Sequence, residues 1–317
     1  MVDVSIVIVC MNKPDNLRVC LPSIQKYTSV SYEVFVVAYL FSKENLSSIR
    51  TEYPWVKIIE SNEIRGFSEN NNLALREATG KYCFVLNDDT EMRMPVIDRL
   101  IETIENLPEN VAIVSPNILK ADGRIQYCGR PKQTWKTVLL YDLLRINVNK
   151  NSPYINKTGV FKSYNILGAA FLIKTEVFKE EGWFDETYFF CPEDIALSTI
   201  LNEKGYECWV NADIPIIHFE GDSGKSCSPV RMATKPAHRR GSLIFYPRGR
   251  WSVWFLMSIS YLFLDILLLF KYGFKVFVLH QDGASRVSFY SLVNLLKISF
   301  THKTPKEIFI KYYKKIR

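Results

Sequence analysis

Three polar side chains directly follow a buried apolar run, and they are the first residues in this sequence whose types suggest chemistry. Asn87, Asp88 and Asp89 come immediately after Tyr82–Leu86. Adjacent carboxylates repel one another unless a cation shares their site, and hard divalent cations prefer such oxygen ligands. Asp and Asn also favour turns and helix N-caps, so a solvated turn before a helix near Pro95 is an equally good interpretation of this motif alone.

Two further groups could act at the same site. Glu193 and Asp194 follow Pro192 at the start of an expected helix, where a carboxylate on a rigid element could serve as a general base. Acidic residues also stabilise the first turn of any helix, so a structural role explains this pair more simply. His218 follows the apolar run Ile214–Ile217. A single histidine is more often a buried structural residue than a metal ligand, but its place at the end of a strand favours a role in a ligand site.

The elements that must position these residues alternate between strand and helix. Apolar runs predict strands at Val4–Cys10, Glu33–Val37, Val56–Ile59, Tyr82–Leu86 and Ile166–Ile173, and periodic segments predict helices at about Asp15–Tyr27, Ser68–Ala78, Thr175–Glu181 and Ile195–Lys204. This alternation predicts a parallel sheet with right-handed crossovers, which binds ligands beyond the carboxyl ends of its strands. Asn87–Asp89 stand at such an end. The first hundred residues therefore predict a nucleotide-binding α/β half.

Two missing motifs narrow the class of nucleotide ligand. The sequence has no G-x-G-x-x-G, so a dinucleotide cofactor is not expected. The segment Met11–Asp15 after the first strand has no glycine, whereas a sugar-nucleotide pyrophosphorylase would carry a Gly-rich, Lys-containing loop there. A nucleotidyltransferase is therefore disfavoured.

Charge is divided unevenly along the 317 residues. Residues 231–317 hold 16 Lys and Arg against 3 Asp and Glu, a balance of +13, whereas the first 230 residues carry −6. A basic, aromatic-rich region predicts an anionic partner, either a membrane surface or nucleic acid. The basic residues are dispersed among large aliphatic residues without a recognised nucleic-acid-binding motif, which favours a membrane and no nucleic acid.

The C-terminal region contains one long apolar segment, Trp251–Phe270, which is nearly long enough to span a bilayer. Ser258, Tyr261 and Asp265 make a narrow polar stripe along it, and basic residues flank both ends, so the positive-inside rule selects no orientation. These features favour a helix that lies on a membrane or packs on the protein over one that spans. The last stretch, Lys306–Arg317, interleaves basic and aromatic residues, as surface-bound helices and solvated terminal helices both do.

The cysteines and the N-terminus predict a cytoplasmic protein. Seven scattered cysteines with no C-x-x-C pair disfavour a disulfide framework and a structural zinc site, and favour a reducing compartment. The apolar run near the N-terminus is too short for a secretory signal and has no basic residue before it. Together with the basic C-terminal region, this predicts a peripheral protein at the cytoplasmic face of a membrane.

Taken in order, these pieces resemble the family 2 glycosyltransferases with the GT-A fold, especially the rhamnosyltransferase-like branch of bacterial polysaccharide-building enzymes. The similarity covers roughly residues 4–246. Its motifs are Val7–Asn12, Glu63–Phe67 with Asn71-Asn72, Leu86–Glu91 in the D-x-D region, Gly168–Ala170, Gly182–Glu186, Glu193-Asp194, Gly205-Tyr206 and His218. The resemblance implies an α/β nucleotide-diphospho-sugar transferase fold, a Rossmann-like mixed sheet flanked by helices. This domain would occupy residues 1–230, with a donor half to about 115, an acceptor half from about 116, and a membrane-associating helical extension over 231–317.

The resemblance also implies roles for particular residues. Asp194 would be the general base, and Glu193 would orient the acceptor or tune that base. Asp89 would bind Mn²⁺ or Mg²⁺, with Asn87 and His218 completing the metal site. The donor-binding residues would be Cys10, Met11, Asn12, Arg65, Gly66, Asn71, Asn87, Asp88 and Gly168.

The function implied is inverting, metal-dependent transfer of a hexosyl or rhamnosyl group from a UDP- or dTDP-sugar to a lipid-linked glycan, in cell-surface polysaccharide biosynthesis. Three positions depart from the family pattern. Ala38 stands where an acid usually recognises the base, Asn87 replaces the first acid of D-x-D, and Ala196 replaces an acid in E-D-x-D-L. A catalytically silent scaffold subunit that binds a nucleotide-sugar is therefore the alternative.

Overall fold

The computed structural model describes residues 2–126, 129–144, 154, 156–219 and 228–316. The chain divides into two compact units. Unit 1 comprises Met1–Lys132, Asn151–Asp185 and Glu193–Phe219, and unit 2 comprises Gln133–Lys150, Glu186–Pro192 and Glu220–Arg317. Unit 2 thus draws on two segments that precede residue 231.

Unit 1 is built on one mixed sheet, in which the described strands follow the order β3-β2-β1-β4-β8-β6-β9-β5, with β7 paired to β9. The strands are β1 (Val4–Met11), β2 (Tyr32–Tyr39), β3 (Lys57–Ser61), β4 (Tyr82–Asn87), β5 (Thr90–Glu91), β6 (Val111–Lys120), β7 (Val160–Ser163), β8 (Ala170–Lys174) and β9 (Glu207–His218). β1 pairs in parallel with β2 on one side and with β4 on the other. The strand order reverses there, so the ends of β1 and β4 form the topological switch point, where such sheets bind ligands.

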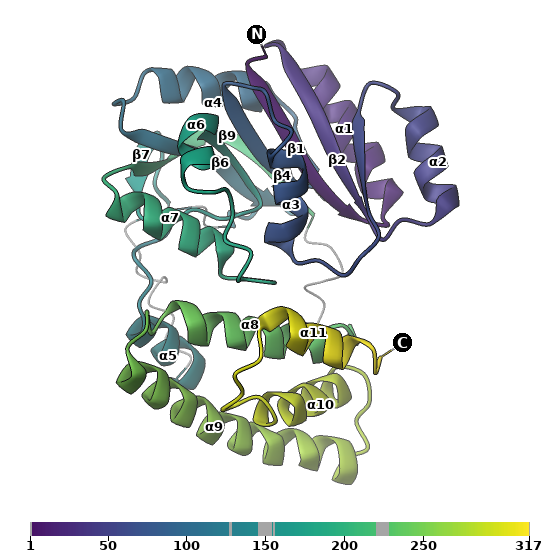
Figure 1. The fold of residues 1–317 in the computed structure, drawn as a ribbon, viewed down its shortest axis with the longest axis vertical. Helices are drawn as coiled ribbons and strands as arrows, with labels where there is room; N and C mark the ends of the chain where they lie inside the picture. Colours follow the sequence, from purple (N-terminus) through teal and green to yellow (C-terminus); the bar gives the residue numbers. More distant parts are fainter. Residues whose placement is uncertain (1, 127–128, 145–153, 155, 220–227, 317) are drawn as a thin grey trace. The chain divides into compact units, whose positions relative to one another are not determined.

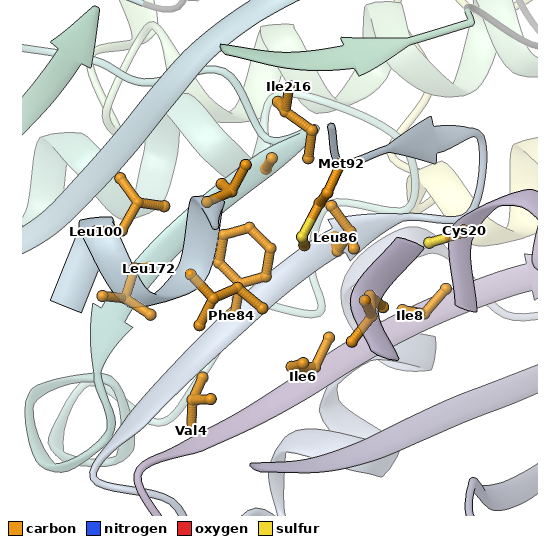
Figure 2. Close-up of a cluster of buried hydrophobic side chains, with 14 of the residues drawn as sticks. Val4, Ile6, Ile8, Cys20, Phe84, Leu86, Met92, Leu100, Leu172 and Ile216 are labelled. Carbon is orange, nitrogen blue, oxygen red and sulfur yellow. The ribbon is translucent and has the colours of Figure 1, made fainter. Parts of the chain in front are cut away.

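Helices cover both faces of this sheet (Figure 1). One face carries α1 (Pro14–Tyr27), α2 (Lys43–Glu52) and α4 (Val96–Glu105), and the other carries α3 (Phe67–Leu75), α6 (Thr175–Glu180) and α7 (Glu193–Glu203). Side chains alternate along a strand, so Val4, Ile6 and Ile8 of β1 enter the core of the first face while Val7 enters the second. Figure 2 shows the first core, where these three residues lie with Phe84.

The strand expected over Ile166–Ile173 is shorter, because β8 begins only at Ala170. Side chains of α7 occupy backbone donors in the preceding residues. The N–H of Ile166 donates to Ser198 Oγ (3.3 Å), and the N–H of Gly168 donates to Asp194 Oδ2 (3.1 Å). An apolar run cannot show that its hydrogen bonds go to a helix, so the sequence overestimated this strand.

A buried carboxylate ties together the edge of the sheet where β1 and β2 begin. Glu33 Oε1 accepts hydrogen bonds from Ser5 Oγ (2.6 Å) and from the N–H and hydroxyl of Thr79 (both 2.8 Å), and Lys57 Nζ lies 2.6 Å from Glu33 Oε2. Burial alone would raise the pKa of Glu33. The hydrogen bonds outweigh burial, and the pKa is lowered from 4.5 to about 2.

Replacing Glu33 with glutamine is expected to lower the free energy of unfolding by about 2 kcal/mol at pH 7. This figure allows for solvent screening of the ion pair, because the Lys57 side chain is exposed. The lowered pKa means that this stabilisation is present above pH 4.5 and is lost as the pH falls toward 2. Urea unfolding between pH 7 and pH 3 should therefore show the two proteins converging. Glu60→Gln, which breaks an exposed pair with Arg50, is the control and should cost less than about 0.5 kcal/mol. A difference independent of pH would contradict this account.

The secondary-structure elements of unit 2 are helices throughout its described residues. Its helices are α5 (Trp135–Leu144), α8 (Arg231–Phe245), α9 (Trp251–Gly273), the π-helix η3 (Phe274–Val278), α10 (Ala284–Leu296) and α11 (Pro305–Tyr313). The predicted helical C-terminal region is thereby confirmed. In α11, Ile308, Phe309, Tyr312 and Tyr313 are buried, and this helix packs on α8. The apolar side of the terminal stretch is therefore covered by protein.

The five cysteines among the described residues are free: Cys10, Cys20, Cys83, Cys191 and Cys208. Cys128 and Cys227 lie outside the described residues.

Candidate functional site

The three predicted metal residues meet at the carboxyl ends of β4 and β9. Asp89 Oδ1 lies 3.1 Å from His218 Nε2, and Asn87 Nδ2 lies 3.3 Å from the same nitrogen. The register of the sheet produces this meeting. β5 pairs antiparallel with β9 so that Thr90 lies opposite His218, and the N–H of Phe219 donates to the Asp89 carbonyl (2.9 Å).

The other nitrogen of His218 is held by a residue that the sequence analysis missed. Gln126 Oε1 lies 2.8 Å from His218 Nδ1. The chain turns back after β6, so that Ile125 bridges Leu119 and the N–H of Gln126 donates to the Ile118 carbonyl (2.7 Å). A carbonyl oxygen only accepts, so this bond places a proton on Nδ1 and leaves Nε2 as the ring nitrogen that faces Asp89 and Asn87.

Asp89 and His218 fit a divalent cation that is shared with a bound ligand. A carboxylate oxygen and an imidazole nitrogen are both metal ligands, and their separation of 3.1 Å matches that of adjacent ligands in an octahedral shell of about 2.1 Å radius, which lie about 3 Å apart. Their side chains are only 11% and 12% exposed. The described residues contain no cluster of three or more His, Cys, Asp or Glu arranged to hold a metal. A cation here would therefore take its other ligands from Asn87, water and an anionic substrate.

The side chains of Asp88 and Cys10 contact residues at the start of α1. Asn16 Nδ2 donates to Asp88 Oδ2 (3.1 Å), and burial raises the pKa of Asp88, against hydrogen bonds from Cys10 and Asn16 that lower it. Cys10 Sγ also lies 3.3 Å from the Lys13 carbonyl oxygen. Burial also raises the pKa of the Cys10 thiol, whose residue is fully buried.

Asn12 and Met11 lie just beyond the switch point. Asn12 has a φ of 48°, and its Oδ1 accepts from the N–H of Ser42 (3.0 Å) and from Asn45 Nδ2 (2.9 Å). The Asn12 side chain therefore joins the end of β1 to the start of α2. Met11 is 44% exposed and open to a ligand.

The predicted donor residues near the start of α3 are each held by local hydrogen bonds. Arg65 Nη1 donates to Ser61 Oγ (3.1 Å), and Arg65 Nη2 pairs with Glu63 (2.9 Å). Gly66 is the N-cap, and its N–H donates to the Glu69 carboxylate (2.9 Å), which is the half of a capping box that needs no N-cap side chain. Asn71 Nδ2 donates to the Phe67 carbonyl (2.9 Å).

The next residue, Asn72, has a structural role that the motif does not reveal. Its amide donates to the Phe184 carbonyl (2.9 Å) and accepts from the Phe184 N–H (3.1 Å). Asn72 thus fastens α3 to the turn Gly182–Glu186, which lies more than a hundred residues away in the chain. A pattern read along the chain carries no signal for this pairing.

Asp194 is held by main-chain donors at the start of α7. Its Oδ2 accepts from the N–H of Gly168 (3.1 Å), and its Oδ1 accepts from the N–H of Ile195 (2.8 Å). A Cβ at position 168 would lie 3.2 Å from the Cβ of Asp194, so glycine permits this approach. Glu193 precedes it as the first residue of α7 and is 8% exposed. A carboxylate held in one orientation, with further lone pairs on each oxygen, has the form that a general base requires.

Asn87 connects the two groups of residues. Its side chain reaches His218, and its N–H donates to the carbonyl of Ala169 (2.9 Å), the residue after Gly168. The Asp89–His218 pair and the Gly168–Asp194 pair therefore border the same end of β4. The remaining predicted donor residues lie at the ends of β1 and β3 or at the start of α3.

Comparisons with known sequences agree with this architecture. The sequence model described as glycosyl transferase family 2 matches residues 5–180. The O-antigen biosynthesis protein RfbC of Myxococcus xanthus is 24% identical over 228 residues, which is 70% of this chain. The match covers 18% of RfbC, so the chain spans less than a fifth of that relative's length.

Two solved structures resemble the fold. GalNAc-T7 with UDP, GalNAc and Mn²⁺ has a TM-score of 0.55 and 19% identity, covering 73% of this chain and 46% of its own. The mannosyltransferase PcManGT of Pyrobaculum calidifontis, in complex with GDP-Man and Mn²⁺, has a TM-score of 0.52 and 16% identity, covering 99% of this chain and 79% of its own. At these identities the likeness concerns the fold, and the predicted GT-A fold is confirmed.

Proposed function

Because this chain belongs to glycosyl transferase family 2, we propose that it transfers a sugar from a nucleoside diphosphate sugar to a hydroxyl of a glycan acceptor. The acceptor would be a glycan of a cell-surface polysaccharide, a substrate class supported by the relative in O-antigen biosynthesis. The two structural neighbours, solved with UDP and with GDP-Man, support a nucleotide-sugar donor.

The observation that carries the proposal is the Asp194 carboxylate, fixed by Gly168 beside the strand end that presents Asp89 and His218. The two carboxylates lie in different surroundings, so they can take different roles. Asp194 is held by neutral N–H donors, while Asp89 faces an imidazole nitrogen. The first arrangement suits proton transfer, and the second suits a cation beside a diphosphate.

We propose a single displacement. Asp194 removes the proton of the acceptor hydroxyl while the oxygen attacks the anomeric carbon of the donor. The bond from that carbon to the diphosphate breaks, and the nucleoside diphosphate leaves with the electron pair. One attack from the face opposite the leaving group inverts the anomeric centre, by the stereochemical logic of one-step glycosyl chemistry. Glu193, next to the base, would orient the acceptor.

Asp89, His218 and Asn87 would hold Mn²⁺ or Mg²⁺. A bound cation supplies Lewis-acid neutralisation of the charge that develops on the departing diphosphate. Gln126 keeps Nε2 of His218 directed at Asp89 through its contact with Nδ1 (2.8 Å). Such outer partners orient metal-binding histidines.

We further propose a particular donor, transferred group and acceptor. The donor is a UDP- or dTDP-sugar, the transferred group is hexosyl or rhamnosyl, and the acceptor is a lipid-linked glycan. The protein would act as a peripheral enzyme at the cytoplasmic face of a membrane, and the +13 balance of residues 231–317 supports this location.

The test is release of nucleoside diphosphate from a panel of UDP-, dTDP- and GDP-sugars, measured with Mn²⁺, with Mg²⁺ and with chelator. Slow release from one donor, present with metal and abolished by chelator, is expected, because water can replace a missing acceptor. Thermal stabilisation by a donor without release, even with lipid-linked acceptors present, would show a silent binding subunit instead. If no donor stabilises the protein and none releases nucleoside diphosphate, the proposal is overturned.

A further inference from the structure

The polar side of α9 faces into unit 2. Ser258, Tyr261 and Asp265 are 1%, 3% and 2% exposed. The Tyr261 hydroxyl donates to Asp142 Oδ2 of α5 (2.9 Å), and Arg239 Nη1 of α8 donates to Asp265 Oδ2 (3.1 Å). These bonds attach α9 to two other helices along one side.

The same residues determine how α9 is rotated about its axis. The Arg239 guanidinium lies over the Tyr261 ring, 3.7 Å from its centroid, and also pairs with Asp265 one turn further along. Turning the helix would break both contacts and leave Asp265 buried without its cation, which is costly. The side of α9 opposite this network is therefore held away from α8 and α5. Figure 1 shows α9 along the edge of unit 2, with α8 and α10 on one side of it.

The opposite side of α9 and η3, here called the outer face, is a continuous apolar strip. Its members include Leu256 (47% exposed), Phe263 (63%), Phe270 (75%), Phe274 (55%) and Phe277 (61%). They are separated by intervals of three, four and seven residues, which place them on one side of a helix. Between Arg250 and Lys271 the only charged residue is Asp265, which is buried. An exposed apolar surface of this extent marks an interaction site.

The length of the outer face and the charges at its ends fit a lipid bilayer. The helix Trp251–Val278 has 28 residues, so it measures about 42 Å, and most of its apolar surface is not buried in the protein. Arg248 and Arg250 precede it, and Lys271 and Lys275 lie near its other end. Bases at both ends suit the headgroups of anionic lipids. A second copy docked on this face, in either direction, would bring these bases against one another.

The polar side of α9 also distinguishes lying on a bilayer from crossing it. This one helix of the described residues is long and apolar enough to span. Crossing would carry Arg239, Asp265 and Asp142 toward the hydrocarbon, because they are bonded to its inner side. Charged groups there are expensive. In a helix parallel to the membrane plane, the polar side stays in the protein and only the outer face meets lipid.

We infer that the outer face of α9 docks unit 2 on an anionic bilayer, with the helix axis lying in the plane of the interface. α11 does not compete for this role, because its apolar residues, including Ile308 and Phe309, are buried. The inference concerns where the protein works and does not depend on sugar transfer.

The experiment measures flotation of the purified full chain with vesicles of 30% phosphatidylglycerol and 70% phosphatidylcholine, or of phosphatidylcholine alone. Binding to the anionic vesicles should be at least tenfold tighter and should weaken between 0.1 and 0.5 M salt. The double variant F263E/F270E should bind at least tenfold more weakly. V160E, which alters a 43% exposed apolar residue of unit 1, is the matched control and should bind like the wild type. F263A/F270A repeats the test without added charge.

The depth of α9 in the bilayer is measured by quenching of tryptophan fluorescence in Phe263→Trp by brominated lipids. Residue 263 lies near the middle of α9, so in a helix that lies flat its added fluorescence is quenched most by bromines near the headgroups. Strongest quenching by bromines near the chain ends would show a spanning helix and overturn the inference. The inference would also be overturned if the wild type bound to none of the vesicles. A wild type that is a dimer in solution, and that F263E/F270E converts to a monomer, would overturn it as well. Release of nucleoside diphosphate without vesicles should be equal in wild type and F263E/F270E, which separates this test from that of the proposed function.

Discussion

Replacing Asp194 with asparagine is expected to lower the rate of sugar transfer by about 10²- to 10⁴-fold, the range that general bases contribute. An amide cannot take the acceptor proton. The two carboxylate oxygens of Asp194 now accept from the N–H groups of Gly168 and Ile195, and asparagine has an oxygen for only one of them. The free energy of unfolding should therefore fall by about 1 kcal/mol.

The measurement separates chemistry from binding. Transfer to an acceptor is followed by kcat, and donor affinity by titration, which should stay within about threefold because the change affects proton transfer. Asp213→Asn is the matched control, since Asp213 Oδ1 also accepts a main-chain N–H, from Gly159 (3.1 Å). It should transfer sugar like the wild type. Transfer by Asp194→Asn above a tenth of the wild-type rate would show that another group is the base.

Replacing Asp89 with alanine is expected to weaken Mn²⁺ binding and metal-dependent donor turnover by about 10²- to 10³-fold. The change removes the carboxylate that faces His218 Nε2 at 3.1 Å, and a bound cation supplies several kcal/mol of charge stabilisation. Binding of Mn²⁺ in the presence of UDP is read by electron paramagnetic resonance, which reports on the site without requiring turnover.

Gln126→Leu provides a graded companion to this change. It leaves every proposed ligand in place and removes only the partner of His218 Nδ1, so Mn²⁺ binding should weaken by about 10- to 100-fold. Asp122→Ala is the control, because this exposed carboxylate of the neighbouring turn pairs with Arg124. Equal turnover by wild type in chelator and in Mn²⁺ would contradict metal dependence. Equal Mn²⁺ binding by Asp89→Ala would place the cation elsewhere.

Much of unit 1 could be predicted because its signals are local. The run Val4–Cys10 has the β-branched composition of a buried strand, and β1 occupies Val4–Met11. The run Tyr82–Leu86 likewise became β4, Tyr82–Asn87. Strands and helices alternate at short intervals, which limits the topologies to those with right-handed crossovers. The parallel pairing of β1 through β4 and the place of Asn87 at a strand end follow from this.

The remaining features depend on groups that are distant in the chain. Gln126 reaches His218 only because of a turn after β6, and Asn72 reaches Phe184 across 112 residues. The polar stripe of α9 was visible in the sequence, but its direction was not. Arg239 and Asp142, on other helices, show that it faces inward.

Residue types and their order along the chain were enough to predict an α/β body of the GT-A fold, the end of the sheet where a ligand belongs, and a basic helical region after it. These are properties of hydrophobic period, charge and motif order, which act over a few residues. The tertiary structure decided that Asp89 meets His218, that Gly168 admits Asp194, and which side of α9 is exposed. Each of these depends on strand register or helix rotation, which distant contacts determine and no local pattern records.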